Sequence, residues 1–94
     1  MKRITLKDKK WGKNERSLLE ACINDMGDLV LEGVDSGESV KEWHEDFDFE
    51  YLHTISVEHV HDVLLNLIKD RFDNAHDYLK WLEEKEIKCE SVSF

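Results

Sequence analysis

Apolar and polar residues alternate in two short stretches of the chain, with the two-residue period of half-buried strands, and a third stretch between them is also typical of a strand. The alternating stretches are Lys2–Leu6 and Phe49–Ile55, and the stretch between them is residues 28–32. The first is followed by a charged segment, residues 7–14, which contains Trp11-Gly12 and predicts a turn. We therefore predict three strands, with a turn directly after the first.

Residues 16–26 fit two patterns. Their apolar positions have helical spacing, and Gly27 could end such a helix. However, Leu19, Ala21 and Ile23 also alternate, and Asn24-Asp25-Met26-Gly27 is typical of a hairpin turn. We favour a strand and a hairpin here, and the helix remains the alternative.

The second half has apolar residues at three- and four-residue intervals, which predicts two helices. Ser56 is a candidate N-cap for a helix over 57–72, and Asp73 or Asn74 is one for the next helix. The apolar stripe of the first helix consists of Val57, Val60, His61, Leu64, Leu67, Ile68 and Phe72. The inner face of the second consists of Ala75, Tyr78, Leu79 and Leu82.

A short helical turn is expected over 40–43 and a closing strand over 87–94. The predicted order is β-β-β-(short α)-β-α-α-β. Grouped strands followed by paired helices indicate an α+β fold. We expect one domain over 1–94, an antiparallel sheet of four to five strands with both C-terminal helices packed on one face.

Charge narrows the function classes. The chain of 94 residues has 13 Lys+Arg and 22 Asp+Glu, a formal net charge of −9. The charge is polarised, with +5 in residues 1–16 and −12 in residues 17–62. A nucleic-acid binder needs positive charge to release counterions, so the net acidity argues against one, and no apolar run approaches the ~20 residues of a membrane helix. We expect a cytoplasmic protein that binds neither nucleic acid nor membrane directly.

Candidate chemistry is sparse. Cys22 and Cys89 lie in apolar-patterned segments, so we expect two buried thiols, with a single disulfide as the alternative. The His59-Val60-His61 spacing does not bring two imidazoles together on a helix. No zinc, calcium or nucleophile-elbow motif occurs. We therefore expect no cofactor, no metal site and no enzymatic activity.

An acidic segment that contains aromatic residues is the candidate partner-binding site. Carboxylates attract a basic surface over long range, and aromatic side chains supply binding energy once they are desolvated. The alternative is a solvated loop whose aromatic residues fold into the core. The candidate residues are Asp35, Glu38, Glu42, Trp43, Glu45, Asp46, Asp48 and Glu50, with Phe47 and Phe49 between the acids.

The runs LVLEGVDSG (29–37) and DFEYLHTISVEHVHDVLLNLI (48–68) carry a resemblance. Together they resemble a class of small, uncharacterised, acidic bacterial domains, in which an acidic-aromatic strand leads directly into a capped, leucine-rich helix. Some of these resemble the immunity partners of secreted toxins. The resemblance implies the strand–helix arrangement and favours an interaction function, and it implies no active-site residues.

Two interaction hypotheses follow. The first is an inhibitor or immunity-type protein that covers a basic protein partner, such as a toxin or a nucleic-acid enzyme; anti-CRISPR proteins share this size and charge. The second is a homo-oligomeric structural or regulatory domain, in which the basic segment of one copy lies across the acidic region of another. A metal-dependent enzyme is a third, weaker hypothesis. The sequence leaves the oligomeric state open.

Overall fold

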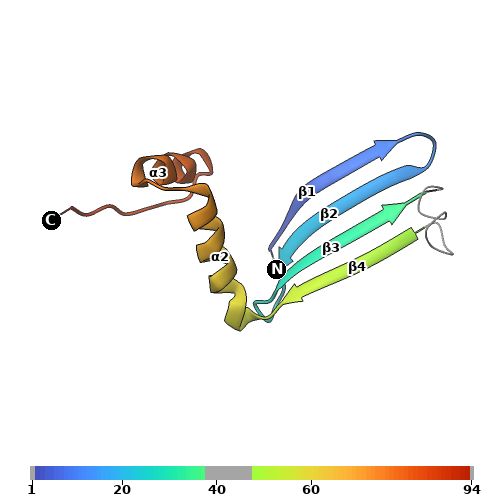
Figure 1. The fold of residues 1–94 in the computed structure, drawn as a ribbon, viewed down its shortest axis with the longest axis horizontal. Helices are drawn as coiled ribbons and strands as arrows, with labels where there is room; N and C mark the ends of the chain where they lie inside the picture. The colour runs from blue at the N-terminus through green and yellow to red at the C-terminus, as the bar shows by residue number, and fades with distance from the viewer. Residues whose placement is uncertain (1, 38–47, 94) are drawn as a thin grey trace. The chain divides into compact units, whose positions relative to one another are not determined.

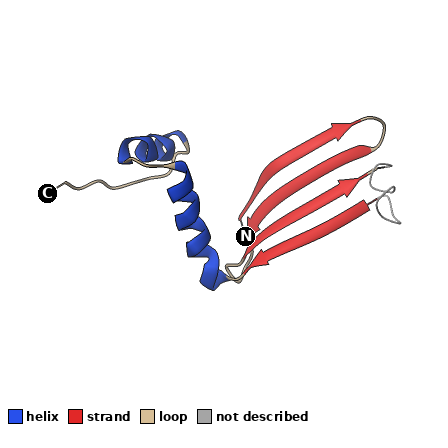
Figure 2. Ribbon diagram, in the orientation of Figure 1, coloured by secondary structure: helices blue, strands red, loops and turns tan. Residues whose placement is uncertain are grey.

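The computed structural model describes residues 2–37 and 48–93, and it shows the α+β class. Four strands form one open antiparallel sheet in the order β1-β2-β3-β4 (Figures 1 and 2). Two helices follow β4 in the chain. The strands are β1 (Lys2–Trp11), β2 (Glu15–Ile23), β3 (Leu29–Ser36) and β4 (Asp48–Ile55), and the helices are α2 (Val57–Arg71) and α3 (Ala75–Glu84).

The hairpin interpretation of residues 16–26 is confirmed. Ile23 pairs with Leu29 across the turn. The Asn24 side-chain oxygen accepts the backbone N–H groups of Met26 at 3.0 Å and Asp28 at 2.9 Å. Gly27 has φ +85°, a conformation open to glycine and costly for most side chains. The turn residues, rather than the apolar spacing, therefore determine that this segment forms a hairpin and not a helix.

The predicted turn over residues 7–14 is wrong for most of its length. β1 continues to Trp11, and only residues 12–14 turn. Every residue of β1 is exposed, so its lysines stay in water while the backbone pairs with β2. A charged run is therefore compatible with an edge strand. The register shifts between Thr5 and Lys7, which marks a bulge in β1.

The helix predictions for 57–72 and for the segment after residue 74 are confirmed. Asn74 is the N-cap of α3, and its side-chain oxygen accepts the Asp77 N–H at 2.9 Å. At the start of α2, the Val57 N–H is held by Asp28 Oδ1 at 2.8 Å. A carboxylate from the β2–β3 turn therefore occupies the positive end of α2. The Ser56 hydroxyl donates instead to Glu58 Oε1 at 3.4 Å.

The predicted closing strand is not formed over residues 87–93, which have no regular structure. The backbone after α3 explains this correction. Glu86 has φ +58°, its N–H donates to Glu83 O at 3.0 Å, and the Ile87 N–H donates to Leu82 O at 2.9 Å. These two bonds are those of a Schellman C-cap. The cap uses the backbone donor of Ile87, the residue at which the strand was expected to begin.

The chain divides into two compact units, residues 1–60 and residues 61–94. In the first unit Cys22, Val30 and Ser17 are buried, and in the second Leu82 is buried. The packing of both helices on one face of the sheet stays a prediction, and the expected helical turn over 40–43 lies outside the described residues. Within the described part of the chain, no helix has the length and apolarity to cross a membrane.

Candidate protein-interaction surface

The structure places three of the eight candidate partner-binding residues. Asp35 lies near the end of β3, Asp48 is the first residue of β4, and Glu50 follows it in the same strand. Ser36 pairs with Asp48, so the ends of β3 and β4 that flank the acidic segment lie side by side. The remaining five, Glu38, Glu42, Trp43, Glu45 and Asp46, lie outside the described residues.

Asp35 and Glu50 lie on opposite faces of the sheet. Residues directly opposite each other in an antiparallel pair share a face. Glu50 is opposite Val34, whereas Asp35 is opposite Phe49 and Ser17. The Ser17 hydroxyl, buried in the sheet, donates to Asp35 Oδ1 at 2.6 Å. The half-buried Asp35 carboxylate therefore stabilises the β2–β3 pair, while the exposed Glu50 faces solvent.

A row of aromatic rings follows β4 on the face that carries Asp35. The ring centroids of Phe49 and Tyr51 are 5.7 Å apart, and those of Tyr51 and His53 are 5.6 Å apart. Gly33 lies opposite Tyr51, and a methyl group at Gly33 would overlap the Tyr51 ring. The glycine in β3 therefore makes room for this ring, which packs over the strand. β4 thus carries aromatic rings on one face and Glu50 on the other.

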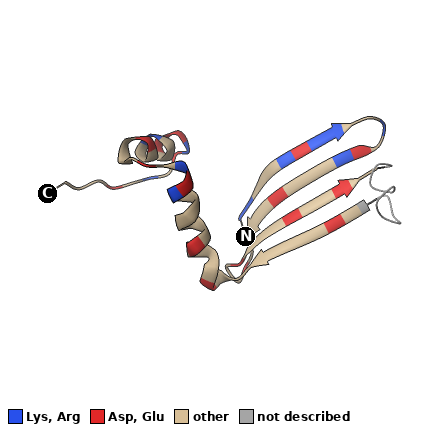
Figure 3. Cartoon of the chain, in the orientation of Figure 1, with Lys and Arg blue, Asp and Glu red and all other residues tan. Residues whose placement is uncertain are grey.

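The basic N-terminal segment is neutralised in part within the chain. Figure 3 shows Lys and Arg concentrated on β1 and Asp and Glu on its neighbours. Arg3 contacts Glu32 at 2.6 Å and Glu20 at 3.5 Å, and the hydrogen bond with Glu32 raises the pKa of Arg3. Arg16 contacts Asp8 at 3.2 Å. These ion pairs lie on the same face of the sheet as Glu50. Basic and acidic residues that are separated along the sequence are therefore paired across neighbouring strands.

The two edges of the sheet differ in chemistry. β1 carries five basic residues and a bulge, features that discourage pairing with a further strand. β4 pairs with β3 in unbroken register, and its last five residues, Tyr-Leu-His-Thr-Ile, include no Asp, Glu, Lys or Arg. Leu52 is 64% exposed. Within the described residues, β4 is therefore the less protected edge.

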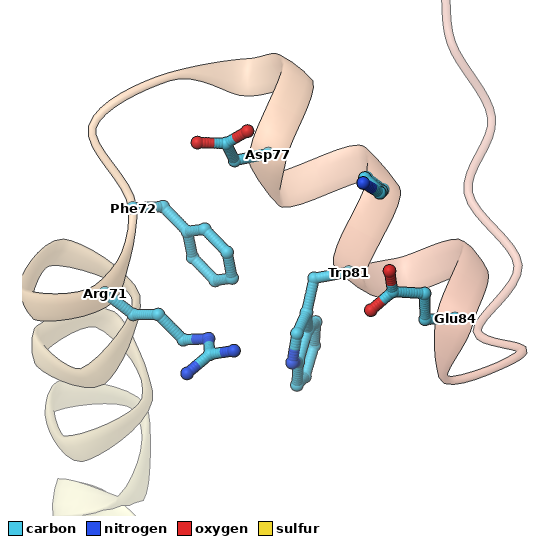
Figure 4. Close-up of a pocket in the computed structure, with 6 residues that line it drawn as sticks. Arg71, Phe72, Asp77, Trp81 and Glu84 are labelled. Atoms are coloured by element: carbon cyan, nitrogen blue, oxygen red, sulfur yellow. The ribbon is translucent and has the colours of Figure 1, made fainter.

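The helical unit has an apolar hollow. Several of its lining residues belong to the apolar stripe predicted for the first helix. The hollow has a volume of about 710 Å³, between α2 and α3. The Phe72 ring packs edge-on against Tyr78 at 5.3 Å and Trp81 at 5.9 Å. Figure 4 shows an adjoining pocket, where Phe72 and Trp81 point toward each other beside Arg71. The hollow is lined mainly by Leu64, Leu67, Ile68, Phe72, Trp81 and Ile87.

Trp81 was missed in the sequence interpretation, although it lies three residues after Tyr78, at helical spacing. Leu79, which was assigned to the inner face, is 41% exposed. The stripe of α2 has the predicted helical spacing, but no residue of α2 is buried. The aromatic contacts of Phe72 therefore identify the inner side of α3 better than apolar spacing does.

The two cysteines have different environments and are both free thiols. Cys22 is buried as expected, at 4% exposure, whereas Cys89 is exposed, so the expectation of two buried thiols is wrong for Cys89. Cys89 lies in the irregular segment after the α3 cap, where no strand buries it. Among the described residues, no three His, Cys, Asp or Glu side chains form a group that could hold a metal ion.

No protein-family model, curated protein or solved structure matches this chain.

Proposed function

We propose that this chain is a small acidic protein-interaction module, an inhibitor or immunity-type protein that covers a basic surface of a partner such as a toxin or a nucleic-acid enzyme. It acts by occupying that surface and not by catalysis. The observation that carries the proposal is the density of acids between Asp35 and Glu50, with Trp43, Phe47 and Phe49 among them.

The described ends of this acidic segment support the proposal. Glu50 is exposed on an edge strand, and the residue before it, Phe49, is 38% exposed on the opposite face of the same strand. The carboxylates would steer a basic partner and raise the association rate. The aromatic residues would contribute burial at the centre of the contact. Asp35 accepts a hydrogen bond from Ser17 and therefore also joins β2 to β3.

Affinity capture from the native host with three baits tests the proposal. The first bait is the wild-type chain. The second carries Asp46→Lys, Asp48→Lys and Glu50→Lys. The third carries Glu83→Lys, Glu84→Lys and Glu90→Lys, which changes the net charge by the same amount at exposed positions of the helical unit. Quantitative mass spectrometry then compares the proteins retained by each bait.

We expect one basic protein to be enriched on the wild-type and third baits and lost from the second. Loss from both altered baits would mean that only net charge matters. Retention by the second bait, or a captured partner without a basic surface, would refute the proposal. Circular dichroism of the three baits establishes that each is folded.

A further inference from the structure

The outer edge of β4 carries an inference that does not depend on the proposed partner. Within the described residues, no strand lies beyond β4, so its outward backbone N–H and C=O groups form a template for another strand. Its side chains are accessible as well. Leu52 is 64% exposed, and His53 and Thr54 are also exposed. Natural sheets protect such an edge with lysine, proline or a bulge, and β4 has none of these.

The charges at the two edges indicate what can pair there. Two copies of β1 side by side would place lysines and arginines near one another. A β1–β4 contact between copies has complementary charge, but the β1 bulge interrupts its ladder. Such a head-to-tail contact adds copy after copy and ends only if the copies close into a ring. Two antiparallel copies of β4 avoid both problems.

We propose that a second copy of this chain pairs with β4 through a two-fold axis, so that two four-stranded sheets join into one. The axis runs through the centre of the strand, at Leu52. Glu50 then lies opposite Thr54 of the second copy, and Tyr51 lies opposite His53. No acid faces an acid. The aromatic row of one copy continues into that of the other, and the two exposed Leu52 side chains contact each other.

This dimer differs from an oligomer held by the basic segment. Its contacts are backbone hydrogen bonds and, apart from Glu50, uncharged side chains, and no pair of opposite charges holds it together, so a rise in salt does not weaken it. A β1–β4 contact would weaken as salt rises and would produce assemblies larger than two. Sedimentation equilibrium over a range of protein concentrations, at about 0.1 M and about 0.5 M salt, separates the two arrangements.

A matched pair of edge variants tests the contact. Leu52→Lys places a charge at the centre of the proposed interface and should raise the dimer dissociation constant about tenfold or more. Ile4→Lys is the control, because Ile4 is 63% exposed on the other edge strand, and it should leave the constant unchanged. Thr54→Glu is a second variant of the same edge, for use if Leu52→Lys does not fold by circular dichroism. It places an acid opposite Glu50 of the second copy, so it should also raise the dissociation constant.

Cysteine cross-linking tests the register. In a Cys89→Ser background, Leu52→Cys should be linked into a covalent dimer by mild oxidation or a short bismaleimide. Thr54→Cys should cross-link poorly, because its own mate is four residues away along the paired strand. A monomer at every concentration, a salt-sensitive assembly larger than two, or a dimer that survives both Leu52→Lys and Thr54→Glu would each overturn the proposal.

Discussion

Glu86 adopts a left-handed backbone conformation, φ +58°, at the end of α3. The chain reverses there without a glycine, although glycine is the residue that usually occupies this position of a Schellman cap. The sequence pattern after residue 86 resembles a strand, and nothing in its alternation reveals that the Ile87 N–H is bonded to Leu82 O. A local backbone bond therefore overrides the apolar periodicity.

Replacement of Glu86 by glycine should stabilise the protein by about 0.5–1 kcal/mol. Relief of the left-handed conformation outweighs the greater freedom of glycine in the unfolded chain. Urea denaturation followed by circular dichroism measures the change. Glu84→Gly, inside the last turn of α3, is the control and should destabilise by about 1 kcal/mol. Destabilisation by both substitutions would show that Glu86 carries no strain.

Ser17 and Asp35 form a second residue-scale test. Ser17→Ala should lower the free energy of unfolding by about 1–2 kcal/mol, because the half-buried Asp35 carboxylate loses its 2.6 Å donor. Ser17→Thr retains the hydroxyl and should retain most of the stability. If Ser17→Ala costs nothing by urea denaturation, Asp35 is solvated and belongs to the acidic surface more fully than its hydrogen bond indicates.

At the scale of elements, one turn and one helix cap were predicted correctly, whereas the turn expected over residues 7–14 was wrong for most of its length. Asn24-Asp25-Met26-Gly27 identified the hairpin, and residues 73–74 located the start of α3. The length of β1 could not be predicted, because an exposed edge strand needs no apolar face and its charged run is typical of a turn. The link between Asp28 and Val57 joins residues 29 positions apart, which no local pattern reveals.

The N-cap of α3 gives an element-scale prediction. Asn74→Ala should destabilise by about 1 kcal/mol, because the Asp77 N–H loses its acceptor. Asp73→Ala should have a smaller effect, since the Asp73 carboxylate accepts a 2.9 Å hydrogen bond from the Asn74 side chain and not from a backbone N–H of α3. Thermal unfolding, followed by the circular dichroism signal of the helices, compares the stability of the two variants. Equal losses for the two variants would contradict the assignment of Asn74 as the cap.

The contact between Asp28 and the first turn of α2 gives a second prediction at the scale of elements. Asp28→Ala removes the acceptor of the Val57 N–H and should speed hydrogen exchange of the first-turn amides of α2 about fivefold or more. Asp28→Asn keeps an oxygen acceptor and should have a smaller effect. Unchanged exchange at Val57 in Asp28→Ala would show that the carboxylate does not cap the helix.

At the scale of the whole molecule, net charge was available from the sequence, but its placement was not. The basic segment pairs within the sheet through Arg3 and Arg16, and Asp35 and Glu50 separate to opposite faces. These outcomes depend on strand register, which composition does not encode. The sequence did identify the acidic segment and the strand that continues it, β4.

Salt dependence of stability tests this placement. Arg3→Gln should lower the urea midpoint at low salt and do so less at high salt, because Glu20 and Glu32 lie directly opposite each other beside it. Lys2→Gln removes the same charge opposite Ile23 and is the control. Equal effects of the two substitutions at low salt would contradict a specific role for Arg3.

The central claim is that the acidic segment attracts a basic partner. The association rate constant with the captured partner, measured from about 20 mM to about 300 mM salt, tests it most directly. We predict that the association rate constant of the wild type falls at least tenfold over this range of salt. The variant with Asp46→Lys, Asp48→Lys and Glu50→Lys should show a weak salt dependence of the same constant. The dissociation rate constant of the wild type should change little with salt. A wild-type association rate that does not vary with salt would contradict the account.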